Sequence, residues 1–71
     1  MRFRLDKELT ERIGYKTIET DLRWYVGETT TLIVDGKTIE RKVYWGAELY
    51  VWLNGYKIFY SDIWKGERDD D

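Results

Sequence analysis

Val34-Asp35-Gly36-Lys37 and Leu53-Asn54-Gly55-Tyr56 decide the fold predicted for this chain of 71 residues. Each tetrapeptide places Asp-Gly or Asn-Gly between runs of apolar, β-branched or aromatic residues, which is the strongest short-range signal for a β-hairpin. A two-residue type I′ turn needs positive φ at both central positions, and Asn, Asp and Gly tolerate positive φ best. The sequence therefore predicts two tight hairpins within residues 29–61.

The turns also predict the register of the strands. The opposed pairs are Val34–Lys37, Leu32–Ile39 and Thr30–Arg41 in the first hairpin, and Leu53–Tyr56, Val51–Ile58 and Leu49–Tyr60 in the second. Alternate side chains of a strand point to opposite sides of its sheet, so each hairpin has one aliphatic side. The predicted core is Leu32, Val34, Ile39, Val43, Leu49, Val51 and Ile58. Trp45 is predicted on the same side as the aliphatic residues of the first hairpin.

The connection between the hairpins, Trp45-Gly46-Ala47-Glu48-Leu49, decides how the two aliphatic sides combine. A two-residue Gly-Ala turn would align Val43 with Tyr50 and put the aliphatic sides on opposite faces. A three-residue connection pairs Trp45 with Leu49 and merges them into one core. Because a slip of one residue turns every side chain over, we predict the three-residue, bulged form.

These hairpins predict a mainly β fold, a small single-domain antiparallel barrel or sandwich. A four-strand meander occupies about residues 28–61, and an N-terminal strand and a short helix complete it. The meander with its Val26-Gly27-Glu28 lead-in resembles SH3-like and OB-like small barrels at the level of fold, and this resemblance transfers no residue or activity. We expect one small β domain over residues 1–66 and an acidic, disordered tail over residues 67–71.

The N-terminal third carries weaker signals. Asp6 as N-cap and Gly14 as the stop predict a short helix with Leu9 and Ile13 on one side. Residues 16–26 alternate as a strand would, although Ile18, Leu22 and Val26 also have helical spacing. We predict a strand there and leave a helix as the alternative.

The chain ends are expected to close the fold. Phe3 and Leu5 indicate a short first strand because they alternate with Arg2 and Arg4. Residues 61–64 indicate one terminal turn, in which Ile63 and Trp64 close an open end of the fold.

The composition argues against catalysis. The chain contains no His and no Cys, so the commonest general acid–base and the thiol nucleophile are missing, and no disulfide or imidazole metal site is available. Its glycines are spaced as turns instead of forming a phosphate loop. We therefore expect a protein that is not an enzyme and needs no cofactor, metal or disulfide.

The chain is also depleted of Gln and Pro and has one Asn, one Ser and one Ala. Two origins produce such a bias: a thermostable hyperthermophile protein, or a de novo designed one. No apolar run approaches the roughly 18 residues that a membrane span requires, and no signal segment is recognisable. If the protein is natural, we expect a cytoplasmic location and no membrane association.

One set of side chains suggests a function. The side of the meander opposite the aliphatic core carries a candidate interaction surface made of Tyr44, Tyr50, Trp52, Phe59, Lys42 and Lys57. Either this side is a second core, covered by the N-terminal segment with its apolar residues, or it is an exposed patch of the kind that marks an interaction site. Tyr and Trp dominate the energetics of protein interfaces.

Three functions remain open. We favour a non-enzymatic structural or protein-interaction module, monomeric or weakly dimeric, that binds a protein partner. A single-stranded nucleic-acid-binding barrel is less favoured, because such binders combine aromatic rings with a basic stripe. Here Glu40 and Glu48 are close to Arg41, Lys42 and Lys57 in the predicted sheet. A designed β scaffold without a natural function is the third.

Overall fold

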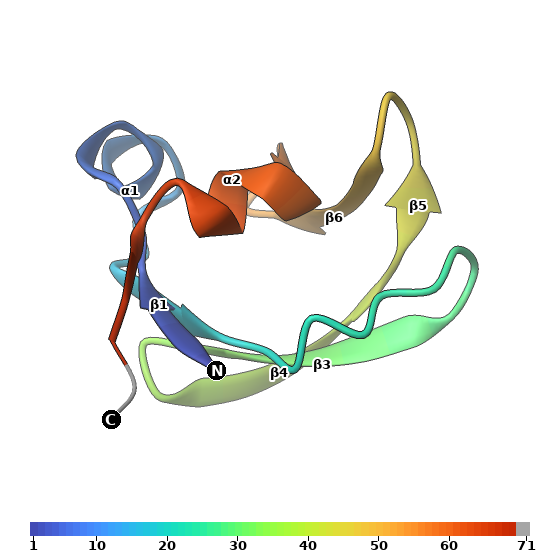
Figure 1. Ribbon diagram of the computed structural model, residues 1–71, viewed down its shortest axis with the longest axis horizontal. Coiled ribbons are helices and arrows are strands. Elements are labelled where there is room, and N and C mark those ends of the chain that lie inside the picture. Colours follow the sequence, from blue (N-terminus) through green and yellow to red (C-terminus); the bar gives the residue numbers. More distant parts are fainter. Residues whose placement is uncertain (70–71) are drawn as a thin grey trace.

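The computed structural model describes residues 1–69 and consists of two antiparallel sheets and two short helices (Figure 1). One sheet has five strands in the order β4-β3-β2-β1-β8, and the other has three in the order β5-β6-β7. The strands are β1 (Arg2–Arg4), β2 (Thr17–Glu19), β3 (Thr29–Val34), β4 (Lys37–Lys42), β5 (Tyr44–Trp45), β6 (Leu49–Leu53), β7 (Tyr56–Phe59) and β8 (Glu67–Arg68), and the helices are α1 (Lys7–Ile13) and α2 (Tyr60–Trp64).

Both predicted hairpins are present with the predicted register. Val34 pairs with Lys37 at the first turn, and Leu53 pairs with Tyr56 at the second. All four central turn residues have positive φ: 48° at Asp35, 82° at Gly36, 50° at Asn54 and 81° at Gly55. These values are those of type I′ turns, whose twist matches that of the flanking strands. The Leu49–Tyr60 pair is not formed, because Tyr60 begins α2.

The second predicted strand is divided into β4 and β5 by a bend at Val43. The N–H of Val43 donates to the carbonyl oxygen of Glu28 over 2.8 Å, and its own carbonyl accepts from the N–H of Gly27 over 2.9 Å. The meander therefore passes from the five-stranded into the three-stranded sheet at this residue. After the bend the predicted three-residue connection is found, because Trp45 pairs with Leu49.

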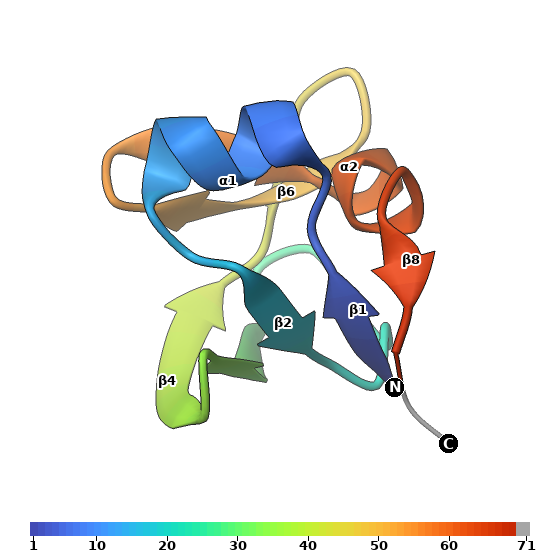
Figure 2. The same cartoon turned by 90° about the vertical axis from the view of Figure 1, so that its left-hand side faces the viewer.

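The two sheets face each other, with the three-stranded sheet above the five-stranded one in Figures 1 and 2. Their inner sides share one cluster of buried residues, as the three-residue connection requires. Among the residues predicted for the core, Leu32, Val34, Val43, Val51 and Ile58 are buried, and Ile39 and Leu49 are partly buried against them. Trp45, which was predicted on the same side, is 65% exposed and does not belong to this core.

The strands of the described residues 1–69 pair within two separate sheets, without a ladder that would close them into a barrel. The coarse prediction of a small, mainly β, antiparallel fold is therefore confirmed.

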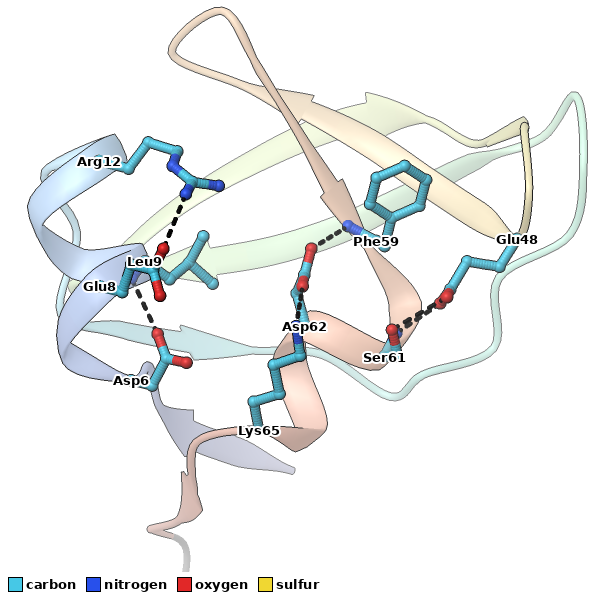
Figure 3. A network of polar contacts seen from close by, with 9 residues as sticks. All are labelled: Asp6, Glu8, Leu9, Arg12, Glu48, Phe59, Ser61, Asp62 and Lys65. Carbon is cyan, nitrogen blue, oxygen red and sulfur yellow. Dashed lines mark hydrogen bonds and ion pairs between the residues drawn. The ribbon is translucent and has the colours of Figure 1, made fainter.

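The predicted N-terminal helix and first strand are also confirmed. Asp6 accepts the backbone N–H of Leu9 over 2.8 Å as N-cap of α1 (Figure 3), and Gly14 ends the helix with a left-handed φ of 82°. The side chains of Phe3, Leu5, Leu9 and Ile13 all enter the shared core. In Figure 1, α1 lies at the left end of the molecule.

The strand predicted over residues 16–26 is limited to β2. After it the chain is irregular, because the hydroxyl of Thr20 accepts both the N–H of Leu22 (3.0 Å) and the indole N–H of Trp24 (3.1 Å). Leu22 adopts a positive φ of 59°. Leu22 and Trp24 are nevertheless buried as the alternation predicts, whereas Val26 is exposed.

The C-terminal segment differs from its prediction. Glu67 and Arg68 form β8, which pairs with β1, and the N–H of Asp69 donates to the carbonyl of Arg2 over 2.8 Å. This part of the expected tail is therefore an edge strand, while residues 70–71 lie outside the described residues. In α2, Ile63 is buried as predicted, and Trp64 is 49% exposed with its ring edge-to-face against Phe3 at 5.0 Å.

Gly66 permits this edge strand to approach β1. A Cβ atom at this position would collide with the carbonyl oxygen of Arg4. We expect Gly66→Ala to separate β8 from β1 and to lower the free energy of unfolding by about 1–3 kcal/mol. Hydrogen exchange at the Asp69 amide should accelerate relative to the other sheet amides. Gly36→Ala is the control, because its positive φ costs stability without touching β8. Unchanged Asp69 protection in Gly66→Ala would contradict this role.

Asp35 has a second role besides its turn. One of its carboxylate oxygens accepts the N–H of Thr17 (2.9 Å), the N–H of Lys16 (3.0 Å) and the hydroxyl of Thr17 (3.3 Å). The Thr17 N–H contributes most to lowering the pKa of Asp35 below its ordinary value of 3.8. The turn of the first hairpin thereby holds the start of β2.

This clamp predicts a specific pH dependence. Because folding lowers the pKa of Asp35, its contribution is complete above the unfolded-state pKa and is lost as the pH falls through the folded-state value. Asn also tolerates the positive φ of this turn position. We therefore expect Asp35→Asn to lower the free energy of unfolding at neutral pH by about 1 kcal/mol, a small value because the carboxylate is exposed to solvent. Urea unfolding at a series of pH values should show this difference shrinking as the pH falls from the unfolded-state pKa through the lowered folded-state pKa. A difference that is constant over this range would exclude the clamp.

Candidate interaction surface

The six residues predicted as an interaction surface lie together on the outer side of the three-stranded sheet and its junction with β4. We call this set the aromatic face: Lys42 from the end of β4, Tyr44 from β5, Tyr50 and Trp52 from β6, and Lys57 and Phe59 from β7. Strand alternation explains the grouping, since Val51 and Ile58 between them point into the core.

Tyr50 is the centre of the aromatic face. Its ring stacks on Tyr44, its cross-strand partner, with centroids 5.6 Å apart and planes 23° apart. It meets Trp52 edge-to-face at 5.9 Å and Phe59 at a tilt at 5.5 Å. Such ring pairs contribute about 0.5–1.5 kcal/mol each beyond their buried area. The side chains of this face therefore hold one another in place without a covering layer.

Two lysines cover parts of the ring system. The ammonium of Lys57 lies 5.0 Å from the ring centroid of Tyr50 and 5.6 Å from that of Trp52. The ammonium of Lys42 lies 5.7 Å from the ring of Tyr44. These distances are those of cation–π contacts. The face therefore combines apolar rings with two exposed positive charges.

Arg41 anchors the face to the other sheet. Its Nε donates to the carbonyl oxygen of Trp52 over 3.1 Å, and its Nη1 donates to the carbonyl oxygen of Glu40 over 2.8 Å. The guanidinium thus bridges β4 of one sheet and β6 of the other. Sequence reasoning missed this role, because it requires two strands that no turn pairs directly.

The C-terminal edge of the face is held by α2 (Figure 3). The N–H of Phe59 donates to the carboxylate of Asp62 over 2.8 Å, and Asp62 also pairs with Lys65 at 3.2 Å. The carboxylate of Glu48 accepts the N–H of Ser61 over 2.8 Å and its hydroxyl over 3.0 Å. Glu48 was expected to lie beside the lysines, and the structure instead engages its carboxylate with the first turn of α2.

The structure distinguishes the two interpretations of this side. The N-terminal apolar residues that were expected to cover it lie in the shared core instead. Tyr44 and Trp52 remain 38% and 41% exposed, while Tyr50 and Phe59 are half-buried by their ring neighbours. The aromatic face is therefore an outer surface and not a second core.

The described part of the chain offers little other chemistry. Residues 1–69 contain no group of three or more carboxylate, imidazole or thiolate side chains placed to hold a metal ion. No helix among them has the length and apolar character needed to cross a membrane. No protein-family model, curated protein or solved structure matches this chain.

The central position of Tyr50 predicts an uneven response to mutation. Tyr50→Ala removes three ring contacts and one lysine contact, so it should lower the free energy of unfolding by about 2 kcal/mol. Tyr56→Ala is the matched control on the same sheet, because Tyr56 is more exposed and takes part in none of these ring contacts; it should cost no more than about 0.5 kcal/mol. Equal losses in urea titrations would show that the ring cluster contributes nothing.

Proposed function

We propose that this protein is a non-enzymatic interaction domain that binds a segment of a protein partner through the aromatic face. The observation that carries the proposal is the uncovered ring cluster flanked by Lys42 and Lys57. Exposed Tyr and Trp in a rigid setting supply large contact area at low cost in conformational entropy. The absence of His and Cys from the sequence supports the non-enzymatic part of the proposal.

The geometry favours a protein over a single-stranded nucleic acid. Binders of single strands stack bases on free ring faces beside a positively charged groove. Here the rings of Tyr44 and Tyr50 stack on each other, and Lys57 lies over Tyr50 and Trp52. Arg41, the third nearby cation, already donates to two backbone carbonyls. The arrangement therefore resembles a protein–protein interface more than a row of free ring faces on which bases could stack.

Charge defines the chemistry of the partner. Lys42 and Lys57 would pair with carboxylates, and the rings would take a large apolar side chain between them. A second copy of the same face would bring these lysines against one another, which disfavours a homodimer formed through it. The partner segment is therefore an acidic one that carries an aromatic or aliphatic anchor.

We also propose that the two facing sheets are a variant of the small SH3-like or OB-like barrel and sandwich architecture. The antiparallel meander and the bent second strand support this assignment. In such folds, binding surfaces are built on exposed sheet faces and adjoining loops. The fold assignment transfers no ligand to this chain.

Selection of random peptides displayed on phage, with the whole chain immobilised, tests the function. We expect selected peptides to combine Asp or Glu with an aromatic or aliphatic residue. Their affinity, measured by fluorescence polarisation, should fall by about tenfold or more in Trp52→Thr and in Lys57→Glu. Trp45→Thr is the matched control and should bind normally, because Trp45 is more exposed than Trp52 and is absent from the ring contacts of this face.

Three results would overturn the proposal. Failure to enrich any peptide would favour a scaffold without a ligand, as in a designed protein. Enriched peptides that bind Trp52→Thr as tightly as the original chain would place binding elsewhere. Binding of oligothymidylate to the aromatic face, with the steep salt dependence of counterion release, would favour the nucleic-acid alternative.

A further inference from the structure

A shallow groove of about 500 Å³ lies on the other sheet, where β1, α1 and the start of β2 meet. Its wall includes Arg4 from β1, Lys7 and Thr10 from α1, and Lys16 and Thr17 at the start of β2. Arg4 and Thr17 are cross-strand partners, and both lie on the outer side because Phe3 and Ile18 beside them are buried. Three cationic residues from separate parts of the chain therefore line one depression.

The backbone around the groove is held in place on both sides. The N–H of Leu5 donates to the carbonyl oxygen of Lys16 over 2.9 Å, which joins β1 to the start of β2. The N–H of Lys16 donates to the carboxylate of Asp35 over 3.0 Å. The hydroxyl of Thr10 lies 3.5 Å from the carbonyl of Leu5. The positions from which the cationic side chains extend are therefore fixed by the fold.

The positive charges of this groove are incompletely balanced. Arg4 forms long ion pairs of 3.9 Å with Glu67 and with Asp69 of the C-terminal segment. Within residues 1–69, neither Lys7 nor Lys16 takes part in an ion pair. Asp35 attracts Lys16 electrostatically. The hydrogen bonds of its carboxylate, however, go to backbone N–H groups and to the hydroxyl of Thr17. Among residues 1–69, Asp69 is the one carboxylate in the wall of the groove.

We propose that this groove binds a phosphoryl group, with Arg4, Lys7 and Lys16 as its cationic donors. A phosphate monoester carries a charge between −1.5 and −2 near neutral pH, which the charges of Lys7 and Lys16 together would balance. Arg presents paired N–H donors to oxyanions, and Lys supplies mobile point charges. The hydroxyls of Thr10 and Thr17 add neutral donors at the wall. This site is independent of the aromatic face and of the function proposed for it.

Asp69 is the internal competitor for this ligand. Its carboxylate lies 3.9 Å from the guanidinium of Arg4 and 3.7 Å from that of Arg2. Asp69 directly follows β8, which pairs with β1. A bound phosphoryl group would take over the Arg4 contact and would be repelled by the carboxylate. Neutralising Asp69 should therefore strengthen binding, while removal of a lysine charge should weaken it.

Amide chemical shifts of the whole chain test the proposal, with inorganic phosphate titrated at an ionic strength held constant by chloride. We expect saturable shifts at Leu5, Thr10 and Thr17 with a dissociation constant on the order of 1–10 mM, since the groove is open to water. Lys16→Gln should weaken binding about fivefold. Asp69→Asn should tighten it about threefold. Lys57→Gln, which removes the same charge from the other sheet, should change it by less than about twofold.

A second arm, with O-phosphoserine in place of phosphate, distinguishes the source of the phosphoryl group. Tighter binding of O-phosphoserine would indicate a phosphorylated side chain, and tighter binding of phosphate would indicate the free ion. Shifts that stay linear in phosphate would overturn the site. Equal weakening by Lys16→Gln and Lys57→Gln would also overturn it, because only net charge would then matter.

Discussion

The backbone of Val43 carries the constraint on which the rest of this structure depends. Its N–H and carbonyl are both satisfied by the turn at residues 27–28, so the chain can leave one sheet and join the other without a buried unpaired polar group. Its side chain is buried between the sheets. Because the chain bends at this residue, the aliphatic sides of both hairpins share one core. The same bend leaves the opposite side of β6 and β7 facing outward.

This arrangement gives the molecule two outer surfaces of different chemistry. The three-stranded sheet presents aromatic rings with Lys42 and Lys57, and it is stabilised by ring contacts within the face. The five-stranded sheet presents a basic groove beside α1, where Lys7 and Lys16 extend from a hydrogen-bonded junction. Apolar contact would dominate binding at the first proposed site and electrostatic attraction at the second, so the two would differ in their dependence on salt concentration.

Local chemistry accounts for what could be predicted about the fold. Asp35-Gly36 and Asn54-Gly55 each define a two-residue turn, and a turn of known length sets the pairing of the strands on both sides. Asp6 and Gly14 delimit α1 in the same local way. The members of the aromatic face followed from strand alternation alone, which is why all six were found together.

Predictions that needed distant contacts were less successful. Trp45 follows the alternation of the core side, but it lies past the bend between the two sheets and its side chain is mostly exposed. Glu67 and Arg68 have the composition of a solvent-exposed tail, yet Gly66 lets their backbone reach β1. The pairing of β8 with β1 and the hydrogen bond from Arg41 to Trp52 produce no periodic pattern in the sequence, because each joins separate segments of the chain.

The sequence by itself determined the hairpin registers, the limits of α1 and the division of β-strand side chains into aliphatic and aromatic sides. These features depend on φ preferences and alternation within a few residues, so they survive without knowledge of the rest of the chain. Only the tertiary structure decided that the aromatic side stays uncovered and that Arg4, Lys7 and Lys16 line one groove. Both outcomes depend on where the N-terminal segment packs, and that is decided by its burial in the shared core and not by its own pattern.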